Sequence, residues 1–221
     1  MTPGYLRYPN VHGNQVTFVA DDDLWLTALD GGRAHRLTID SNPPRSPRFS
    51  PDGKRIAYAG NVGGGFDLHV VDLAGGRRRL TWLAANRLLV CGWLDDGHVL
   101  VVSDHSVPHR GLAWLYSVSL DGDLARIPWG PAGAADTHRN GKVVVASPNF
   151  RGPEMWKRYR GGEASRLWVS DSERATWTRI LPDVTASLTG PAWFGDRIIF
   201  TSDLGAELPG KPGEQAQLWS V

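Results

Sequence analysis

The 221-residue chain has a single cysteine, Cys91, and no long apolar run. One cysteine cannot form a disulfide within the chain, so a disulfide-stabilised secreted scaffold is excluded and a reducing compartment is favoured. No stretch approaches the ~18 apolar residues that a membrane-spanning helix needs. Residues 1–9 also lack the apolar core of a signal peptide. We therefore expect a soluble, cytoplasmic protein without a membrane partner.

The chain also lacks an excess of charge of either sign, since its formal net charge is +1 at pH 7. A strong basic excess would indicate binding to nucleic acid or to an anionic membrane surface, so neither is expected as a partner. Glycine (26 residues), proline (15) and tryptophan (10) are plentiful instead. Many turn-forming residues between short runs of aromatic and β-branched residues are typical of an all-β protein with short strands.

One hairpin, at residues 48–58, shows the pattern that recurs along the chain. Pro51, Asp52 and Gly53 form a predicted tight turn, and Ile56 and Tyr58 lie on one side of the strand that follows. Proline presets φ at the first turn position, aspartate bonds its own backbone, and glycine accepts a positive φ. Asp52 is therefore predicted to form the turn and not to act as an acid.

This hairpin pattern repeats five times. A turn of Gly, Asn or Asp followed at once by a β-branched or aromatic run occurs at residues 11–18, 49–58, 93–101, 138–145 and 193–200. A second motif follows each hairpin and ends at Trp25, His69, Tyr116, Trp168 and Trp219. This spacing suits four-stranded propeller blades of about 40–50 residues. A β-sandwich also has alternating strands, but it would not repeat two motifs five times.

The repeats predict an all-β fold, a β-propeller of four-stranded antiparallel blades. Four complete blades are expected at residues 9–40, 43–83, 86–129 and 134–182, and an incomplete fifth at 185–221. A propeller closes its ring because open sheet edges are otherwise left unpaired. We therefore expect that the ring is not closed in this chain, and that the chain is a segment of a longer propeller.

Recognisable catalytic patterns are missing. The sequence has no G-x-S-x-G, H-E-x-x-H or C-x-x-C motif, and Cys91 stands in an apolar strand pattern that favours packing over reactivity. We expect no catalytic residue, cofactor or metal in this chain. His105 and His109 beside Asp104 have the composition of a metal site, but their proline-containing loop favours a solvated turn. Carboxylate runs such as Asp21–Asp23 are interpreted as turn formers.

The longest loop, residues 147–162, is the least generic part of the chain. Trp156 and Tyr159 stand among Lys157, Arg158 and Arg160. Aromatic rings with basic groups could stack on a ligand or a partner chain and pair with its carboxylate. Alternatively, the rings fill a gap in the blade while the basic stems lie along the surface. The sequence leaves both interpretations open.

The blades resemble the N-terminal, six-bladed propeller of the tricorn protease family. The resemblance is carried by residues 10–14, 22–25 and 48–57, and most specifically by the Trp-Lys-x-Tyr-Arg-Gly-Gly pattern at 156–162. It implies a non-catalytic segment of a cytoplasmic, hexameric serine peptidase that degrades oligopeptides downstream of the proteasome. The segment would form a wall or channel for peptide passage. Its partners would be the oligopeptides, the remaining blades and the catalytic domains of the parent chain.

The resemblance also implies a basic site near the start of the third blade that holds the C-terminal carboxylate of a peptide. Here the region reads Ala84–Leu88, and only Arg87 is basic. The candidate peptide-binding residues are therefore Arg87 and the loop residues Trp156, Lys157, Arg158, Tyr159 and Arg160. Because TolB-type propellers share the Ser-Pro-Asp-Gly hairpin, a TolB- or WD40-like interaction propeller with no peptidase attached is the alternative.

Overall fold

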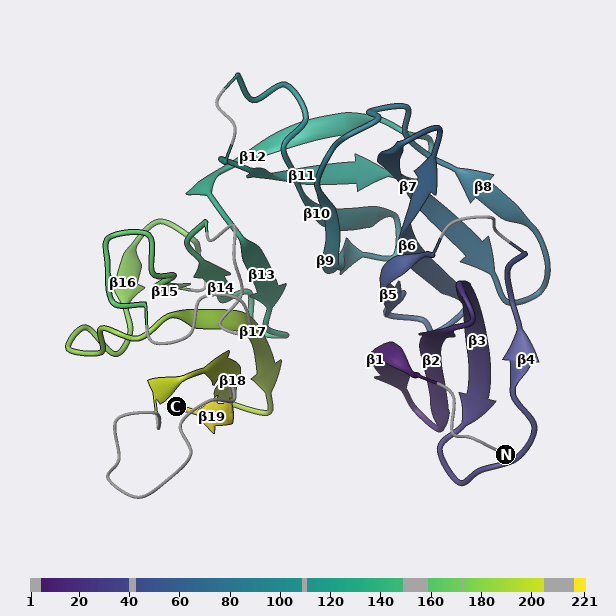
Figure 1. Cartoon of the computed structure of the whole chain (residues 1–221), viewed down its shortest axis with the longest axis horizontal. Helices are drawn as coiled ribbons and strands as arrows, with labels where there is room; N and C mark the ends of the chain where they lie inside the picture. The colour runs from purple at the N-terminus through teal and green to yellow at the C-terminus, as the bar shows by residue number, and fades with distance from the viewer. Residues whose placement is uncertain (1–4, 40–42, 109–110, 149–158, 172, 205–216) are drawn as a thin grey trace. The chain divides into compact units, whose positions relative to one another are not determined.

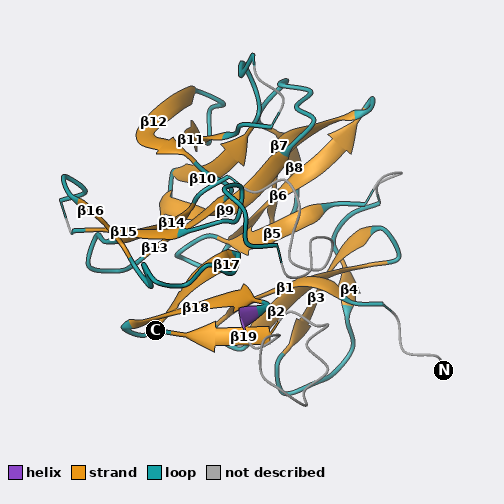
Figure 2. Cartoon of the chain, turned by 60° about the vertical axis from the view of Figure 1, so that its left-hand side comes forward, coloured by secondary structure: helices purple, strands orange, loops and turns teal. Residues whose placement is uncertain are grey.

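The computed structural model describes residues 5–39, 43–108, 111–148, 159–171, 173–204 and 217–221. Strands and loops make up nearly all of this described part (Figures 1 and 2). None of its residues lies in a helix that is long and apolar enough to cross a membrane. The strands, in chain order, are β1 (Arg7–His12), β2 (Gln15–Ala20), β3 (Asp23–Ala28), β4 (His35–Arg36), β5 (Arg45–Phe49), β6 (Arg55–Val62), β7 (Gly65–Asp72), β8 (Arg77–Arg79), β9 (Leu88–Asp95), β10 (His98–Ser103), β11 (Trp114–Ser119), β12 (Leu124–Pro131), β13 (Ala134–Thr137), β14 (Val143–Ala146), β15 (Leu167–Ser170), β16 (Trp177–Arg179), β17 (Leu188–Phe194), β18 (Arg197–Ser202) and β19 (Gln217–Ser220).

These strands form five antiparallel sheets in the described part of the chain. Each sheet takes its strands in sequence order: β1 to β4, β5 to β8, β9 to β12, β13 to β16, and β17 to β19. Such an up-and-down sheet of four short strands is the blade of a β-propeller. The predicted fold class is confirmed, with four four-stranded blades and three strands of a fifth.

The chain folds as two compact units. The first contains Met1–Ser106 with Leu115–Pro128, and the second contains Val107–Trp114 with Trp129–Val221. Each unit has a core made by the buried faces of neighbouring sheets. In the first unit, Val19 and Leu24 pack with Ile56 and Tyr58. In the second unit, residues of β14 and β15 pack with residues of β17 and β18, including the buried Phe200.

The hairpin that defined the repeat is formed as predicted. Phe49 of β5 pairs with Ile56 of β6, and Gly53 has a φ of 69°, which glycine adopts without strain. The Asp52 carboxylate accepts hydrogen bonds from the Ser50 hydroxyl at 2.6 Å and from the Lys54 backbone N–H at 3.0 Å. Asp52 is thus a turn former.

The interpretation of Asp21–Asp23 as turn formers is correct for Asp21 and Asp22, which have φ values of 46° and 63°. It is wrong for Asp23, which begins β3 and is 1% exposed. The Asp23 carboxylate accepts a hydrogen bond from the Thr38 hydroxyl at 2.9 Å and pairs with the Arg36 guanidinium. The same hydroxyl accepts the backbone N–H of Leu24, so one buried carboxylate ties β3 to the segment at β4.

The second blade repeats this network. Asp67 is fully buried, accepts the Thr81 hydroxyl at 3.0 Å and pairs with Arg79 at 2.8 Å. It also accepts the backbone N–H of Leu83. The common sequence is Asp-Leu on the third strand and Arg-Leu-Thr at the fourth. A charge without water is stable only when it is paired and hydrogen-bonded, so the motif fixes how the two strands meet.

Another link joins the inner strand of one blade to that of the next, and it occurs in both units. The Asn10 side chain accepts the backbone N–H of Phe49 at 2.9 Å, while the His12 ring contacts the Phe49 ring. In the second unit, the Asp136 carboxylate accepts the N–H of Trp193 at 2.7 Å, and His138 contacts the Trp193 ring. Both links use an acceptor and a histidine two residues apart.

We predict that Asp67→Ala destabilises the protein by about 3 kcal/mol, because it removes the buried carboxylate that pairs with the Arg79 guanidinium and accepts the Thr81 hydroxyl. Urea unfolding followed by circular dichroism would measure this loss. Asp30→Ala is the control, since Asp30 is an exposed turn residue, and it should change stability by less than about 0.5 kcal/mol. Equal effects of the two substitutions would contradict a stabilising role for the buried network.

A second prediction concerns the pH response of the hairpin turn. The hydrogen bonds from Ser50 and Lys54 lower the pKa of Asp52 below its ordinary value of 3.8. The turn is therefore fully stabilised above that ordinary pKa, and this stabilisation is lost as the pH falls through the lower folded pKa. Ser50→Ala should raise the pKa of Asp52 in an NMR titration and leave the Asp95 titration unchanged. An unchanged Asp52 midpoint would contradict the assignment.

Candidate functional site

Arg87, the candidate in the first unit, lies immediately before β9 and is partly buried. Two backbone contacts hold it against Asp104, which follows β10. The N–H of Arg87 donates to the Asp104 carboxylate at 3.0 Å, and the Arg87 carbonyl accepts the N–H of Asp104 at 3.2 Å. The structure thus fixes the backbone of Arg87 at the end of the β9–β10 pair.

The charge of Arg87 persists despite its partial burial. Burial lowers the pKa of the Arg87 guanidinium, and the neighbouring Cys91 and Asp104 act in the opposite direction. A guanidinium stays protonated at neutral pH even when its pKa falls, so Arg87 offers a fixed positive charge. A partly desolvated cation of this kind can bind a carboxylate more strongly than an exposed one can.

The second candidate group belongs to the other unit. Trp156, Lys157 and Arg158 lie outside the described residues, whereas Tyr159 and Arg160 are described and partly buried. One Arg160 nitrogen contacts both carboxylate oxygens of Asp203, at 3.2 and 3.1 Å. Asp203 follows β18 and is 4% exposed. Arg160 therefore neutralises a buried carboxylate, a structural role that the sequence pattern did not reveal.

Arg160 also belongs to a basic cluster, together with Arg166 and Arg179. Burial lowers the pKa of Arg166, and the positive charges of Arg179 and Arg160 lower it further. One Arg166 nitrogen donates to the backbone carbonyls of Ser165 and Ala186, at 3.2 and 3.1 Å. These contacts hold the segment before β15 against the segment before β17.

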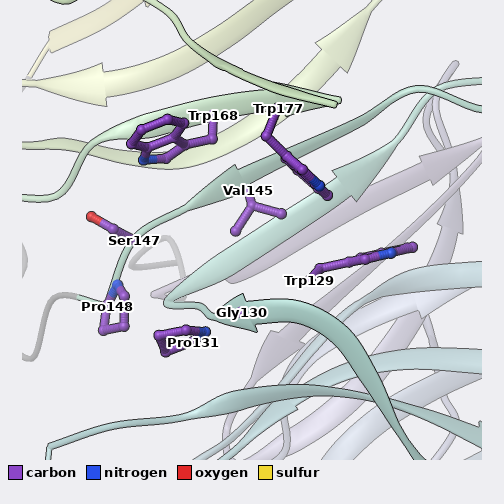
Figure 3. Close-up of a pocket in the computed structure, with 8 residues that line it drawn as sticks. All are labelled: Trp129, Gly130, Pro131, Val145, Ser147, Pro148, Trp168 and Trp177. Carbon is purple, nitrogen blue, oxygen red and sulfur yellow. The ribbon is translucent and has the colours of Figure 1, made fainter. Parts of the chain in front are cut away.

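The second unit also contains a pocket that the sequence analysis did not predict (Figure 3). We call this cavity of about 330 Å³ the Trp pocket. It is lined by Trp129, Gly130, Pro131, Val145, Ser147, Pro148, Trp168 and Trp177. Figure 3 shows the two prolines on the opposite side of Val145 from Trp168 and Trp177.

Strand register explains why these rings share one side of the sheet. Directly paired residues point to the same face. Val145 of β14 pairs with Trp168 of β15, and Ser170 of β15 pairs with Trp177 of β16. Trp168 and Ser170 are two residues apart, so all four side chains lie on one face. The alternation of side chains around Trp168 and Trp177 could have been recognised in the sequence. The strand register that places the two rings on the same face could not.

The third indole comes from the end of β12. Trp129 lies 6.2 Å from Trp177 between ring centroids, with the rings tilted by 55°. Gly130 follows it with a φ of 82°, a value that favours glycine and bends the strand between Trp129 and Pro131. The guanidinium of Arg174 lies 5.7 Å from the centre of the Trp129 ring. The pocket is therefore aromatic, and the Arg174 guanidinium lies at the face of one of its rings, Trp129.

Other candidate chemistry is not assembled in the described part of the chain. Within it, no group of three or more His, Cys, Asp or Glu side chains could hold a metal ion. His109 of the sequence-derived His–Asp group lies outside the described residues. Cys91 is 6% exposed in β9, which agrees with its predicted packing role.

The five sheets in the described part of this chain, each with three or four antiparallel strands in sequence order, place it in the β-propeller class. A model of the tricorn protease N-terminal beta propeller domain matches residues 3–221. The chain belongs to this family.

The relatives support this assignment. Tricorn protease homolog 1 of Streptomyces coelicolor is 40% identical over 205 residues, covering 91% of this chain and 19% of the relative. A putative tricorn-like protease N-terminal subunit of Sulfurisphaera tokodaii is 31% identical, covering 76% of this chain and 87% of that protein. The crystal structure of the tricorn protease superposes with a TM-score of 0.84 at 27% identity, covering all of this chain and 21% of that one. The chain thus spans about a fifth of the length of several relatives.

We predict that Arg160→Ala destabilises the second unit by about 2–3 kcal/mol, because it leaves the buried Asp203 carboxylate without its cation. Thermal and urea unfolding would measure the change. Arg139→Ala is the matched control, because the Arg139 side chain is 82% exposed and forms a long ion pair of 4.0 Å with Asp196, whose side chain is 85% exposed. If the two variants are equally stable, the Arg160–Asp203 pair does not contribute to the stability of the fold.

Proposed function

We propose that this chain is a non-catalytic propeller segment of a tricorn-type serine peptidase that degrades oligopeptides downstream of the proteasome. In this role it forms a wall or channel along which peptides pass toward a catalytic domain elsewhere in a longer parent chain. The observation that carries the proposal is the 40% identity to the Streptomyces coelicolor tricorn protease homologue, over 91% of this chain. The parent is proposed to be a cytoplasmic hexamer, whose other blades and catalytic domains are the partners of this segment.

Within this role, Arg87 binds the C-terminal carboxylate of a peptide. Its partly buried guanidinium supports the assignment, because a partly desolvated cation binds a carboxylate more strongly than an exposed one does. The backbone contacts to Asp104 fix where this residue lies on the β9–β10 pair. Arg87 is the one basic residue in Ala84–Leu88. The site therefore provides one cation for the carboxylate from this part of the chain.

The loop residues are proposed as a second group of peptide contacts. Tyr159 offers a partly buried ring, and Trp156, Lys157 and Arg158 add an aromatic ring and two cations in sequence. Arg160 contributes through its pairing with Asp203, which fixes the end of the loop against the segment after β18. Aromatic rings and cations of this kind recognise peptide side chains and carboxylates.

The alternative function is a TolB-like interaction propeller with no peptidase attached. A putative TolB structure from Agrobacterium tumefaciens has a TM-score of 0.71 with this chain at 17% identity, which shows a shared fold. The two functions differ in their ligand. A peptidase segment binds short peptides through their termini, whereas an interaction propeller binds a folded partner and ignores the state of a peptide terminus.

The proposal predicts that the purified chain binds a fluorescein-labelled alanine-rich hexapeptide with a free C-terminal carboxylate and leaves it intact. The amidated peptide should bind about tenfold more weakly or worse, since a charge-assisted hydrogen bond contributes about 1.5–3 kcal/mol. Fluorescence polarisation measures binding, and chromatography of the recovered peptide measures cleavage.

Arg87→Ala should remove the preference for the free carboxylate, and Arg78→Ala is the control because Arg78 is an exposed arginine of the same unit. Cleavage by this chain would overturn the non-catalytic assignment. Equal affinity for the acid and the amide would overturn the role of Arg87. Binding of a folded partner without any binding of short peptides would favour the TolB-like alternative.

A further inference from the structure

The Trp pocket has the size and surface of a ligand site. Its volume of about 330 Å³ lies at the lower end of the range of about 300–1,000 Å³ that is usual for small-molecule pockets. Three indole rings, two proline rings and Val145 form most of the wall, and Ser147 supplies the one hydroxyl. No charged side chain lines the pocket among the residues that the structure describes. The occupant must therefore present mainly apolar surface.

The residues that line the pocket include three indole N–H donors. The indole N–H groups of Trp129, Trp168 and Trp177 make no hydrogen bond to the described residues, although the indoles of Trp25 and Trp93 do. The Ser147 hydroxyl already accepts the N–H of Arg166 at 2.8 Å, and its carbonyl accepts the Ser165 hydroxyl at 2.9 Å. Three indole N–H groups of the lining residues are therefore available as donors to an occupant that carries acceptors.

The charge around the pocket excludes one common occupant of tryptophan-lined sites. Quaternary ammonium groups bind to aromatic cages because the ring faces attract cations. Here the Arg174 guanidinium already lies over Trp129, and no carboxylate lines the pocket in the described residues. A second cation would meet like charge without a compensating anion. A neutral occupant that carries hydrogen-bond acceptors fits better.

We infer that the Trp pocket binds an extended, proline-bearing peptide segment. Proline brings an apolar ring and a carbonyl acceptor and has no N–H, which matches a site of indole faces and indole donors. Polyproline II segments leave their carbonyls free of internal hydrogen bonds, and they are ordered before binding, so they lose little entropy. The inference concerns a different site from Arg87 and holds whether or not the chain serves a peptidase.

The test uses the purified 221-residue chain and a fluorescein-labelled, C-terminally amidated peptide of alternating alanine and proline pairs. Its matched partner has alanine at every proline position. Fluorescence polarisation should show binding of the proline peptide and at least tenfold weaker binding of the alanine peptide. The amide terminus keeps the experiment independent of carboxylate binding at Arg87, so each proposal can fail without the other.

The variants test the pocket itself. Trp168→Ala should weaken binding about tenfold or more, as truncation of a buried interface tryptophan commonly does. Trp168→Phe should cause a smaller loss, because it keeps an aromatic ring but removes the N–H donor. Trp82→Ala is the control, since Trp82 is 73% exposed in the first unit, and it should bind as the unchanged chain does. Circular dichroism melts verify that each variant is folded.

Three results would overturn the inference. The first is equal affinity for the proline and alanine peptides. The second is a Trp168→Ala variant that is folded and binds the proline peptide as well as Trp82→Ala does. The third is tighter binding of a trimethyl-lysine peptide than of the proline peptide, which would identify the pocket as a cation cage.

Discussion

The pairing of a buried aspartate with an arginine and a threonine determines how the outer half of the first two blades is built. Asp23 and Asp67 are both withdrawn from water, and a carboxylate in that position is tolerated only with several donors around it. The donors come from the fourth strand and the residues just after it. The outermost strand is short, as in β4 and β8, yet the network holds it in one register against its neighbour. Short strands can therefore complete a blade without a large apolar surface of their own.

The inner strands use a different device, which links one blade to the next. An acceptor at Asn10 or Asp136 takes the backbone N–H of an aromatic residue in the following blade. A histidine two residues further along contacts the ring of that same aromatic residue. A directional hydrogen bond and a ring contact at one residue fix both the position and the rotation of the neighbouring strand. The first and second blades, and likewise the fourth and fifth, are thus held by these specific contacts as well as by an apolar core.

The fold could be predicted well from the sequence because the turns and strands of a propeller blade are determined largely by residues close together in the chain. The turn at Pro51–Gly53 and the strand alternation after it depend on a few neighbouring residues, and the repeat made the pattern unmistakable. The buried polar contacts and the Trp pocket were harder to predict. Asp23 follows two turn aspartates directly in sequence, and only tertiary packing reveals that its side chain enters the interior. The partner of Arg160 lies 43 residues away along the chain, at Asp203. The Trp pocket needs the register of three strands, which no local pattern supplies.

Cys91 gives the molecule a property that follows from its burial. It is the chain's one thiol, and it lies in β9, four residues after Arg87. A buried thiol reacts with an alkylating reagent only when the surrounding structure opens, so its reaction rate measures the opening equilibrium of that strand. The alkylation rate of Cys91 therefore reports how often the sheet beside Arg87 opens. A ligand that stabilises the closed sheet would lower this rate, and no introduced label is needed to measure it.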